Sequence, residues 1–73
     1  MKDLGKTIAK YRKEHKLNQS QLAKELENYD IYVKQNSISA WELGTATPNA
    51  RQFLALCEIL EIYDIYTEFV DQS

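Results

Sequence analysis

This sequence of 73 residues has few of the residues that form disulfides, metal sites and phosphate-binding loops. It has one cysteine, one histidine and two glycines. Cys57 has no second thiol with which to form a disulfide, and one cysteine with one histidine falls short of a four-ligand zinc site. Isolated glycines exclude the glycine-rich loops that hold nucleotide phosphates. Neither a nucleophile with its base nor a metal cluster can be assembled, so we expect no enzyme, no metal and no cofactor.

Long apolar runs are also absent from the sequence. No stretch approaches the roughly 20 apolar residues that span a bilayer, and no apolar segment typical of a signal peptide follows Met1. The lack of disulfides fits a reducing compartment. We therefore expect a soluble cytoplasmic domain that has no membrane contact and no small-molecule ligand.

The length of the chain allows one domain. Chains below roughly 70–80 residues bury a small core, so this one needs closely packed helices or a second copy of itself. We expect residues 1–70 to form the domain. The polar residues 71–73 are expected to be a tail, or the start of a linker to a further domain.

The formal net charge of −2 is distributed unevenly along the chain. Residues 1–16 hold six Lys or Arg and two Asp or Glu, a net charge of +4, whereas residues 57–73 hold five acids and no base. The basic first end suits contact with a polyanion, and the acidic second end suits contact with solvent or another protein. Two ordinary solvated helix faces would give the same pattern.

Apolar residues recur at the spacing of helices along most of the chain. Asp3 is placed to cap a first helix, and Asn18 with Gln21 and Asn49 with Gln52 have the pattern of capping boxes. Without hairpin signals, these features predict an all-α fold, a compact bundle of five short helices at about 4–15, 18–26, 35–43, 49–62 and 64–70.

Two segments interrupt the helical pattern. Gly44 can take the left-handed conformation that ends the third helix, and residues 45–48 follow as a loop. In the segment from Glu27 to Val33, apolar and polar residues alternate over too few positions for a sheet, which predicts an extended connection.

The order of several motifs resembles one known family. The segment LNQSQLA at 17–23 is followed by NSISAWELG at 36–44, then by Pro48 and a helix around 54–60. This order resembles the Cro/repressor-type helix-turn-helix family, also called XRE-like, over nearly the whole chain. The resemblance implies a lambda-repressor-like DNA-binding domain whose helix-turn-helix is formed by the second and third helices.

The resemblance also implies a function. It is sequence-specific binding of double-stranded DNA by a transcriptional regulator, most simply a repressor, with the recognition helix at about 35–43 in the major groove. A homodimer on a near-palindromic operator, in a bacterial or phage setting, would follow. Two alternatives stay open: a protein-interaction module such as an antitoxin or adaptor, and the amino-terminal half of a larger signal-sensing repressor.

Residues of the third helix match the positions that read bases in the family. A carboxamide donates and accepts at once, so Gln35 and Asn36 suit adenine, while a hydroxyl or methyl group one turn later can reach a base or a thymine methyl group. The predicted base contacts are Gln35, Asn36, Ser39 and Ala40.

A second set matches positions that contact the DNA backbone. Lys34 stands where the family commonly has a Ser or Thr cap, and it offers a cation to phosphate instead. Arg51 is a further candidate for a phosphate contact. The predicted backbone contacts are the cation Lys34 and five neutral residues: Gln19, Ser37, Thr45, Thr47 and Asn49.

Other residues have expected structural roles. The resemblance implies a salt bridge between Arg12 and Glu42 that fixes the recognition helix on the scaffold. Trp41 and Cys57 are expected in the core, and His15 is expected to complement the end of the first helix or to lie exposed. The last helix is expected to form the dimer surface or to seal the bundle, through Ile65, Tyr66, Phe69 and Val70.

One segment departs from the family. Between Leu26 and Ser37 the chain has about five residues more than the usual helix-turn-helix spacing. Either the second helix gains a turn or the connection bulges outward. Of Tyr29 and Tyr32 in this segment, one is expected to cover the core and the other to lie exposed.

Overall fold

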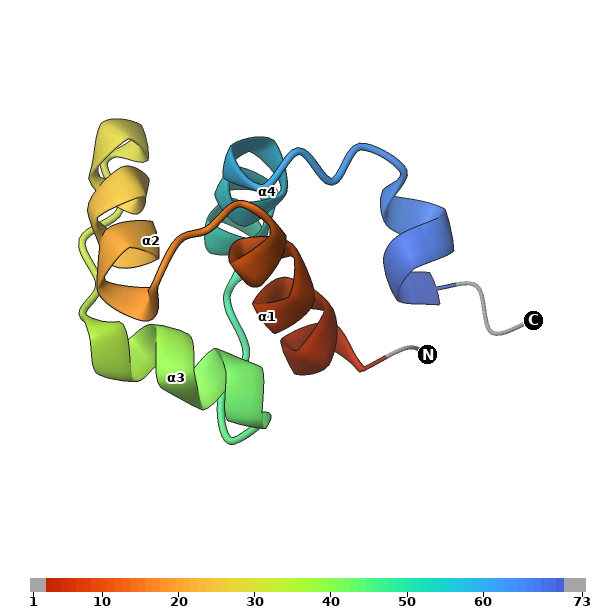
Figure 1. Ribbon diagram of the computed structural model, residues 1–73, viewed down its shortest axis with the longest axis horizontal. Helices are drawn as coiled ribbons and strands as arrows, with labels where there is room; N and C mark the ends of the chain where they lie inside the picture. Colours follow the sequence, from red (N-terminus) through yellow and green to blue (C-terminus); the bar gives the residue numbers. More distant parts are fainter. Residues whose placement is uncertain (1–2, 71–73) are drawn as a thin grey trace.

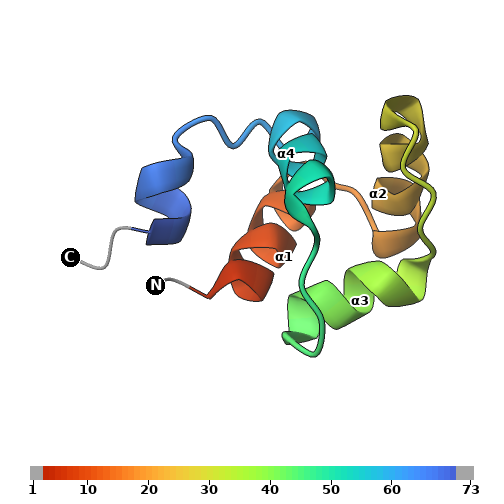
Figure 2. The same ribbon diagram turned by 180° about the vertical axis from the view of Figure 1, so that it is seen from behind.

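The computed structural model describes residues 3–70, so the predicted tail at 71–73 lies outside the described residues. The described part is all-α and contains no strand, which confirms the predicted fold class. Figure 1 shows α1 and α4 at the centre, with α2 and α3 on one side and the last turn on the other; Figure 2 shows the same arrangement from behind. The elements are α1 (Leu4–Glu14), α2 (Gln19–Leu26), η1 (Glu27–Tyr29), α3 (Gln35–Leu43), α4 (Ala50–Ile59) and η2 (Tyr66–Val70).

Side-chain caps set the starts of three helices. The Asp3 carboxylate accepts a hydrogen bond from the backbone N–H of Lys6 at 3.0 Å. Asn18 accepts from the N–H of Gln21 at 2.7 Å, and the Gln21 side chain accepts from the N–H of Asn18 at 2.8 Å. The same reciprocal pair forms between Asn49 and Gln52. Both predicted capping boxes are confirmed, and each cap is worth about 1 kcal/mol.

A glycine allows α1 and α3 to pack closely. A Cβ atom on Gly5 would lie closer than 3.0 Å to the backbone carbonyl oxygens of Trp41 and Glu42. Because these are backbone atoms, they cannot move aside as a flexible side chain can. Gly44 serves a different purpose, since its φ of 82° is the left-handed conformation that ends α3 as predicted.

The core is formed by one apolar cluster from all four α-helices. Trp41 and Cys57 are 4 % exposed and belong to it, as predicted. The side chains that are buried most completely are Ile8, Leu22, Leu26, Ile38, Leu56 and Leu60. Each contributes on the order of 1.5–3 kcal/mol of burial free energy, which explains how a chain without disulfides holds its fold.

The prediction of an extended connection is wrong for its first residues. Glu27–Tyr29 forms the 3-10 turn η1, which continues α2, and Asp30 then takes a left-handed φ of 59°. Ile31 is buried because this reversal turns it back onto the core. Tyr29 is partly covered at 39 % exposure, and Tyr32 lies exposed at 73 %. The extra length is therefore accommodated by a turn added after α2, which is the first of the two predicted alternatives.

The last turn differs from the prediction in its geometry and in one residue. Asp64 caps it by accepting a hydrogen bond from the N–H of Thr67 at 3.2 Å, but the turn itself is a π-helix at Tyr66–Val70. Phe69 is not on a free surface: it is 2 % exposed and packs edge-on against Phe53, with ring centroids 4.8 Å apart. It seals the bundle, because its ring fits between α4 and α1. Tyr66 and Val70 stay exposed.

His15 has a partner that the sequence does not indicate. Its Nε2 lies 3.0 Å from a carboxylate oxygen of Glu61, in the turn after α4.

In the part of the chain that the structure describes, no helix is long and apolar enough to cross a membrane.

Candidate nucleic-acid interface

The packing of α3 decides which of its side chains face outward. Successive residues of a helix are 100° apart, so the buried Ile38 and Trp41 define the inner side. The residues opposite them are Asn36, Ser39, Ala40 and Leu43. In Figure 1 this helix lies across the lower end of α2, at the edge of the molecule. Three of the four predicted base contacts therefore share one outward face.

Gln35 lies at the side of this face that borders α2. Its side-chain N–H donates to the side-chain oxygen Oε1 of Gln19, and its own Oε1 accepts from the Ser20 hydroxyl, both at 3.3 Å. A carboxamide has two N–H groups and two lone pairs on its oxygen. Gln35 is thus oriented by α2 and keeps a donor and an acceptor for another partner.

The same polar network continues inward to α1. Gln19 donates to a Glu42 carboxylate oxygen at 3.0 Å, and Arg12 donates to both oxygens of Glu42, from Nε at 2.6 Å and from a terminal nitrogen at 3.0 Å. Arg12 also donates to the Leu17 carbonyl at 2.8 Å. The bidentate pair and its neighbours therefore join α1, α2 and α3 to one another.

The ion pair between Arg12 and Glu42 is buried, so it affects the stability of the domain more than an exposed pair would. The side chains of Arg12 and Glu42 are 11 % and 9 % exposed. Desolvation raises the pKa of the Glu42 carboxyl, but the hydrogen bonds from Arg12 and Gln19 outweigh it, and the pKa lies below its usual value. The carboxylate is therefore charged at neutral pH and keeps α3 in place.

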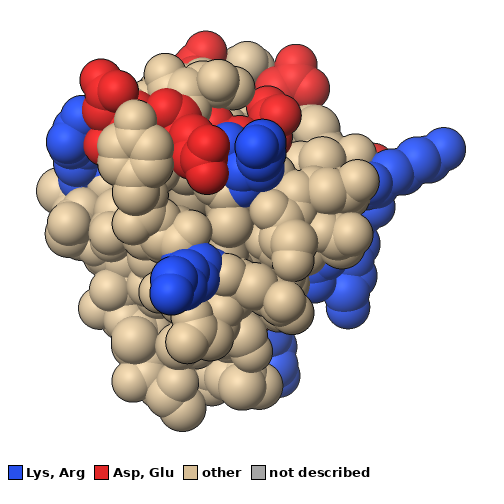
Figure 3. All heavy atoms as spheres, turned by 90° about the vertical axis from the view of Figure 1, so that its left-hand side faces the viewer, with Lys and Arg blue, Asp and Glu red and all other residues tan. Residues whose placement is uncertain are grey.

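Charge is distributed over the molecule in a way that suits a polyanion near α3. Figure 3 views the side of α2 and α3 and shows the acidic side chains gathered at the upper end, where α2 ends. The lower half of this view is mostly uncharged, with separate basic side chains. On this face, the carboxylates that would repel phosphate thus lie away from the lower end.

Comparison with known families assigns this arrangement. A family described as "Helix-turn-helix domain" matches residues 5–68. The chain belongs to this helix-turn-helix family. It is of the XRE type, so the resemblance seen in the motifs is confirmed. No curated protein and no solved structure matches the chain significantly.

Membership in the helix-turn-helix family indicates DNA binding and transcription regulation, and the family is typically not enzymatic. The matched range includes the whole segment 27–34, so the added turn η1 lies within the helix-turn-helix domain. Among residues 3–70, no three His, Cys, Asp or Glu side chains are grouped to hold a metal ion.

The other predicted contacts of the helix-turn-helix domain lie at the starts of helices, in the loop after α3 and on the flank of α3. Gln19 and Lys34 lie at the starts of α2 and α3, and Lys34 makes no side-chain cap bond. The Thr45 hydroxyl donates to the Ala40 carbonyl at 3.3 Å, and Asn49 caps α4, which leaves its side-chain N–H groups for other partners. Thr47 is exposed beside them, whereas Ser37 is half-buried on the flank of α3 away from α2.

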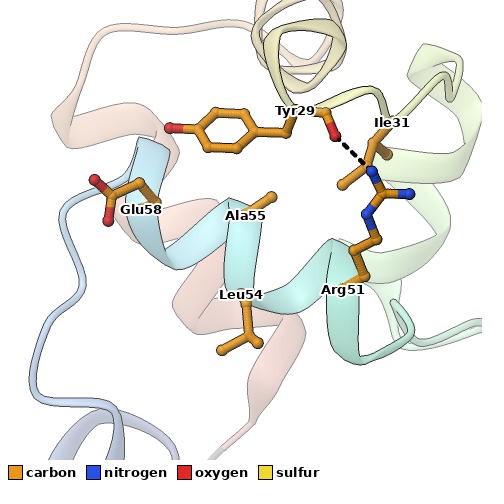
Figure 4. Close-up of a pocket in the computed structure, with 6 residues that line it drawn as sticks. All are labelled: Tyr29, Ile31, Arg51, Leu54, Ala55 and Glu58. Atoms are coloured by element: carbon orange, nitrogen blue, oxygen red, sulfur yellow. Dashed lines mark hydrogen bonds between the residues drawn. The ribbon is translucent and has the colours of Figure 1, made fainter.

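Arg51 has a structural role that the sequence does not indicate. A terminal nitrogen of its guanidinium donates to the backbone carbonyl of Tyr29 at 3.0 Å. Figure 4 shows this bond between α4 and the segment after α2. Arg51 therefore braces η1 on α4 and is not proposed as a phosphate contact.

Two residues of the interface were missed in the sequence. Ser20 orients Gln35, and its place directly after the Gln at the start of the second helix could have suggested this. Leu43 is 75 % exposed and follows Asn36 by seven residues, so it lies on the same face. That spacing alone would have found it.

Proposed function

We propose that this domain binds double-stranded DNA in a sequence-specific way as a transcriptional regulator, acting as a repressor, with α3 in the major groove. The observation that carries the proposal is the oriented amide of Gln35, held by Gln19 and Ser20 beside the outward face of α3. An amide fixed in this way at the start of a recognition helix suits the donor and acceptor pair of adenine.

Base readout is assigned to the four residues predicted for it. Gln35 and Asn36 are exposed near the start of α3, where recognition helices approach base edges. Ser39 offers a hydroxyl to a base or phosphate, and Ala40 offers a methyl group to thymine. None of these side chains is charged, so they supply specificity and little of the salt-dependent affinity.

Phosphate contacts set the register of α3. We assign them to Lys34 and Gln19 near the start of the helix, and to Ser37, Thr45, Thr47 and Asn49 along and beyond it. Because Lys34 is the one cation among them, few counterions are released on binding. The affinity is therefore expected to fall gently with salt.

A homodimer is the second part of the proposal. An apolar groove of about 300 Å³ lies beside the exposed Val70 and half-buried Ile65, with the sealed Phe69 beneath. Its other lining residues are Leu4, Pro48, Ala50 and Phe53. We assign Ile65, Tyr66 and Val70 to the contact with a second copy, which would place two α3 helices on a near-palindromic site.

One experiment tests the DNA proposal directly. Selection of binders from random duplex DNA, followed by affinity measurements at several salt concentrations, should enrich one motif with two related half-sites. Enrichment of no motif, or equal affinity for all duplexes, would contradict the proposal.

We propose a cytoplasmic setting in a bacterium or phage, and a role without catalysis. Residues 1–70 are proposed as the domain, and residues 71–73 as its tail or a linker.

A second candidate function is a protein-interaction module such as an antitoxin or adaptor. The acidic side chains gathered at the end of α2 favour it, because they suit a basic protein and not a polyanion. If the domain is the amino-terminal half of a larger signal-sensing repressor, it would bind both DNA and another protein. Failure of the DNA selection would leave this candidate as the better one.

A further inference from the structure

A small hollow lies between η1 and α4, on a part of the molecule that takes no part in the DNA proposal. It has a volume of about 250 Å³. We call it the η1–α4 hollow; it is lined by Tyr29, Ile31, Arg51, Leu54, Ala55 and Glu58. In Figure 4 the Tyr29 ring extends above α4, with Glu58 beyond its hydroxyl end.

The hollow is held open by contacts within the chain. Asp30 reverses the backbone with a φ of 59°, which leaves Tyr29 outside and turns Ile31 inward. Arg51 then fixes the Tyr29 carbonyl at 3.0 Å. Ile31 and Ala55 are each 6 % exposed and form the inner wall. A partner would therefore find the hollow preformed, which lowers the entropy lost on binding.

Exposed apolar side chains surround the opening. Leu54 lines the hollow and is 59 % exposed, in addition to the partly covered Tyr29. A cluster of exposed large apolar residues in a small domain is typical of an interaction surface.

The charge around the hollow selects the partner. Glu58 lines it, and the exposed Glu27 and Asp30 stand in the segment that carries Tyr29. The lining also contains one base, Arg51, whose charge balances that of Glu58, so the excess of negative charge around the hollow comes from Glu27 and Asp30. Figure 3 shows acidic side chains gathered at this end of the molecule. A positively charged partner is therefore favoured over an acidic one.

The size of the hollow indicates what enters it. Pockets for small molecules typically have volumes of about 300–1,000 Å³, and this open hollow is smaller. It suits one or two apolar side chains of a peptide better than a metabolite or cofactor.

We propose that the η1–α4 hollow binds an apolar side chain of a basic peptide segment belonging to a partner protein. None of the lining residues lies on α3, and in Figures 1 and 2 the hollow's elements lie at the end of the molecule opposite α3. The partner can thus bind while α3 occupies DNA. The inference does not depend on DNA binding, and its test is separate.

Chemical-shift mapping with the isotope-labelled full chain tests the proposal. The probe is a short synthetic peptide with adjacent leucines flanked by lysines. Two matched peptides replace the leucines with serine or the lysines with glutamate. We expect the first peptide to shift the amides of Tyr29, Leu54 and Glu58, and the other two to bind at least about tenfold more weakly. Equal binding of the serine peptide, or shifts spread over other surfaces, would overturn the proposal.

Variants add a second criterion. Leu54→Ser and Glu58→Gln change exposed side chains, so both are expected to fold and to weaken peptide binding several-fold. Glu14→Gln, an exposed acid on α1, is the matched control and should leave peptide binding unchanged. Unchanged peptide affinity in Leu54→Ser would contradict the proposal. If the same amides shift when the protein alone is concentrated, a second copy occupies the hollow and the peptide assignment is wrong.

The DNA experiment separates this inference from the proposed function. Leu54→Ser is expected to select the same DNA motif as the unchanged chain with the same affinity, because its side chain is remote from α3. Loss of the motif in this variant would contradict the independence of the two surfaces.

Discussion

Gln35 is an exposed side chain whose orientation is already restricted by its neighbours in the free domain. An exposed glutamine samples many rotamers, and fixing it costs roughly 1.5–2 kcal/mol of conformational entropy. Gln19 and Ser20 already restrict it in the free domain, through two bonds of 3.3 Å. These bonds are long, so they orient the amide without competing strongly with a base.

The roles of Gln35 and Lys34 can be separated by substitution. Gln35→Ala is expected to relax preference at one base position by about 1–3 kcal/mol, because it removes the amide that we propose reads a base edge. Lys34→Ala is expected to weaken binding to all sequences alike and to lower the salt slope by about 1, because it removes the phosphate contact that we propose for Lys34. Affinities on a set of single-base variants at several salt concentrations measure both effects. A uniform loss on every duplex for Gln35→Ala would show that its assignment to a base is wrong.

At the level of elements, α1 is the support on which α3 rests. Gly5 brings the two backbones together, and the Arg12–Glu42 pair fixes their rotation. Because Gln19 bonds to the same carboxylate, α2 is positioned with them. Removing one partner of a buried pair is costly, on the order of 3–5 kcal/mol, although burial of the intact pair is not by itself a gain.

Gly5→Ala tests the close approach of α1 and α3. Alanine is a better helix former than glycine by about 1 kcal/mol, so the substitution would stabilise an exposed helix. Here the added methyl group meets two backbone carbonyls, and we expect net destabilisation of at least the roughly 1–3 kcal/mol typical of overpacking. Urea denaturation measures the free energy of unfolding. Ala9→Gly, on the same helix, is the control for propensity, and a stabilised Gly5→Ala variant would contradict the packing.

His15 connects the end of α1 to the turn after α4. Its Nδ1 lies 2.9 Å from the Tyr11 carbonyl oxygen and its Nε2 lies 3.0 Å from the Glu61 carboxylate. Both partners are acceptors, which favours the doubly protonated ring, and the hydrogen bond with Glu61 raises the pKa of His15 above its usual value of 6.5. The pair is largely exposed, so its contribution is small.

The raised pKa of His15 makes a signed prediction about stability. A raised folded pKa means that the contribution is fully present below the unfolded pKa of 6.5 and is lost as the pH rises through the folded pKa. The free energy of unfolding should therefore decrease slightly as the pH rises from 6.5 through the folded pKa. Urea denaturation across this range, with NMR titration of the ring, measures it. Glu61→Gln should remove most of the dependence, and an unchanged His15 titration in that variant would contradict the pairing.

At the level of the whole molecule, the two ends of the chain carry opposite charge. The first helix carries much of the positive charge, and the residues from Cys57 onward carry acids without a base. The last turn lies against both central helices: Phe69 packs on Phe53 of α4, and η2 also contacts α1. On the α1 side, hydrogen bonding to Glu68 is the main cause that raises the pKa of Tyr11 to about 12.

The proposed homodimer gives a prediction at this scale. Val70→Asp adds a charge to the edge of the apolar groove, so we expect a monomer by analytical ultracentrifugation. Because the two half-sites would no longer be bound together, affinity for the selected duplex should fall by about 10²-fold or more. Tyr32→Asp, at an exposed position remote from this groove, should keep the dimer. A Val70→Asp variant that sediments like the unchanged chain would argue against this surface.

Local patterns were sufficient for much of the fold. The caps at Asn18 and Asn49, the break at Gly44 and the burial of Trp41 follow from neighbouring residues, and each is as predicted. Residues 27–30 were not predicted correctly, because the alternation of the segment favours extension while the burial of Ile31 and the brace from Arg51 favour a turn. These opposing contacts come from α4, more than twenty residues later in the chain.

The helices and their caps could be predicted from sequence because they depend on residues within one or two turns of each other, and the helix-turn-helix family because its motifs occur in a fixed order along the chain. Only the tertiary structure decided that Phe69 seals the core, that Gln19 and Ser20 orient Gln35, that His15 meets Glu61, and that a hollow opens between η1 and α4. Each of these results joins residues that are distant along the chain. Spacing within the sequence carries no information about such contacts, since they are set by how the helices pack.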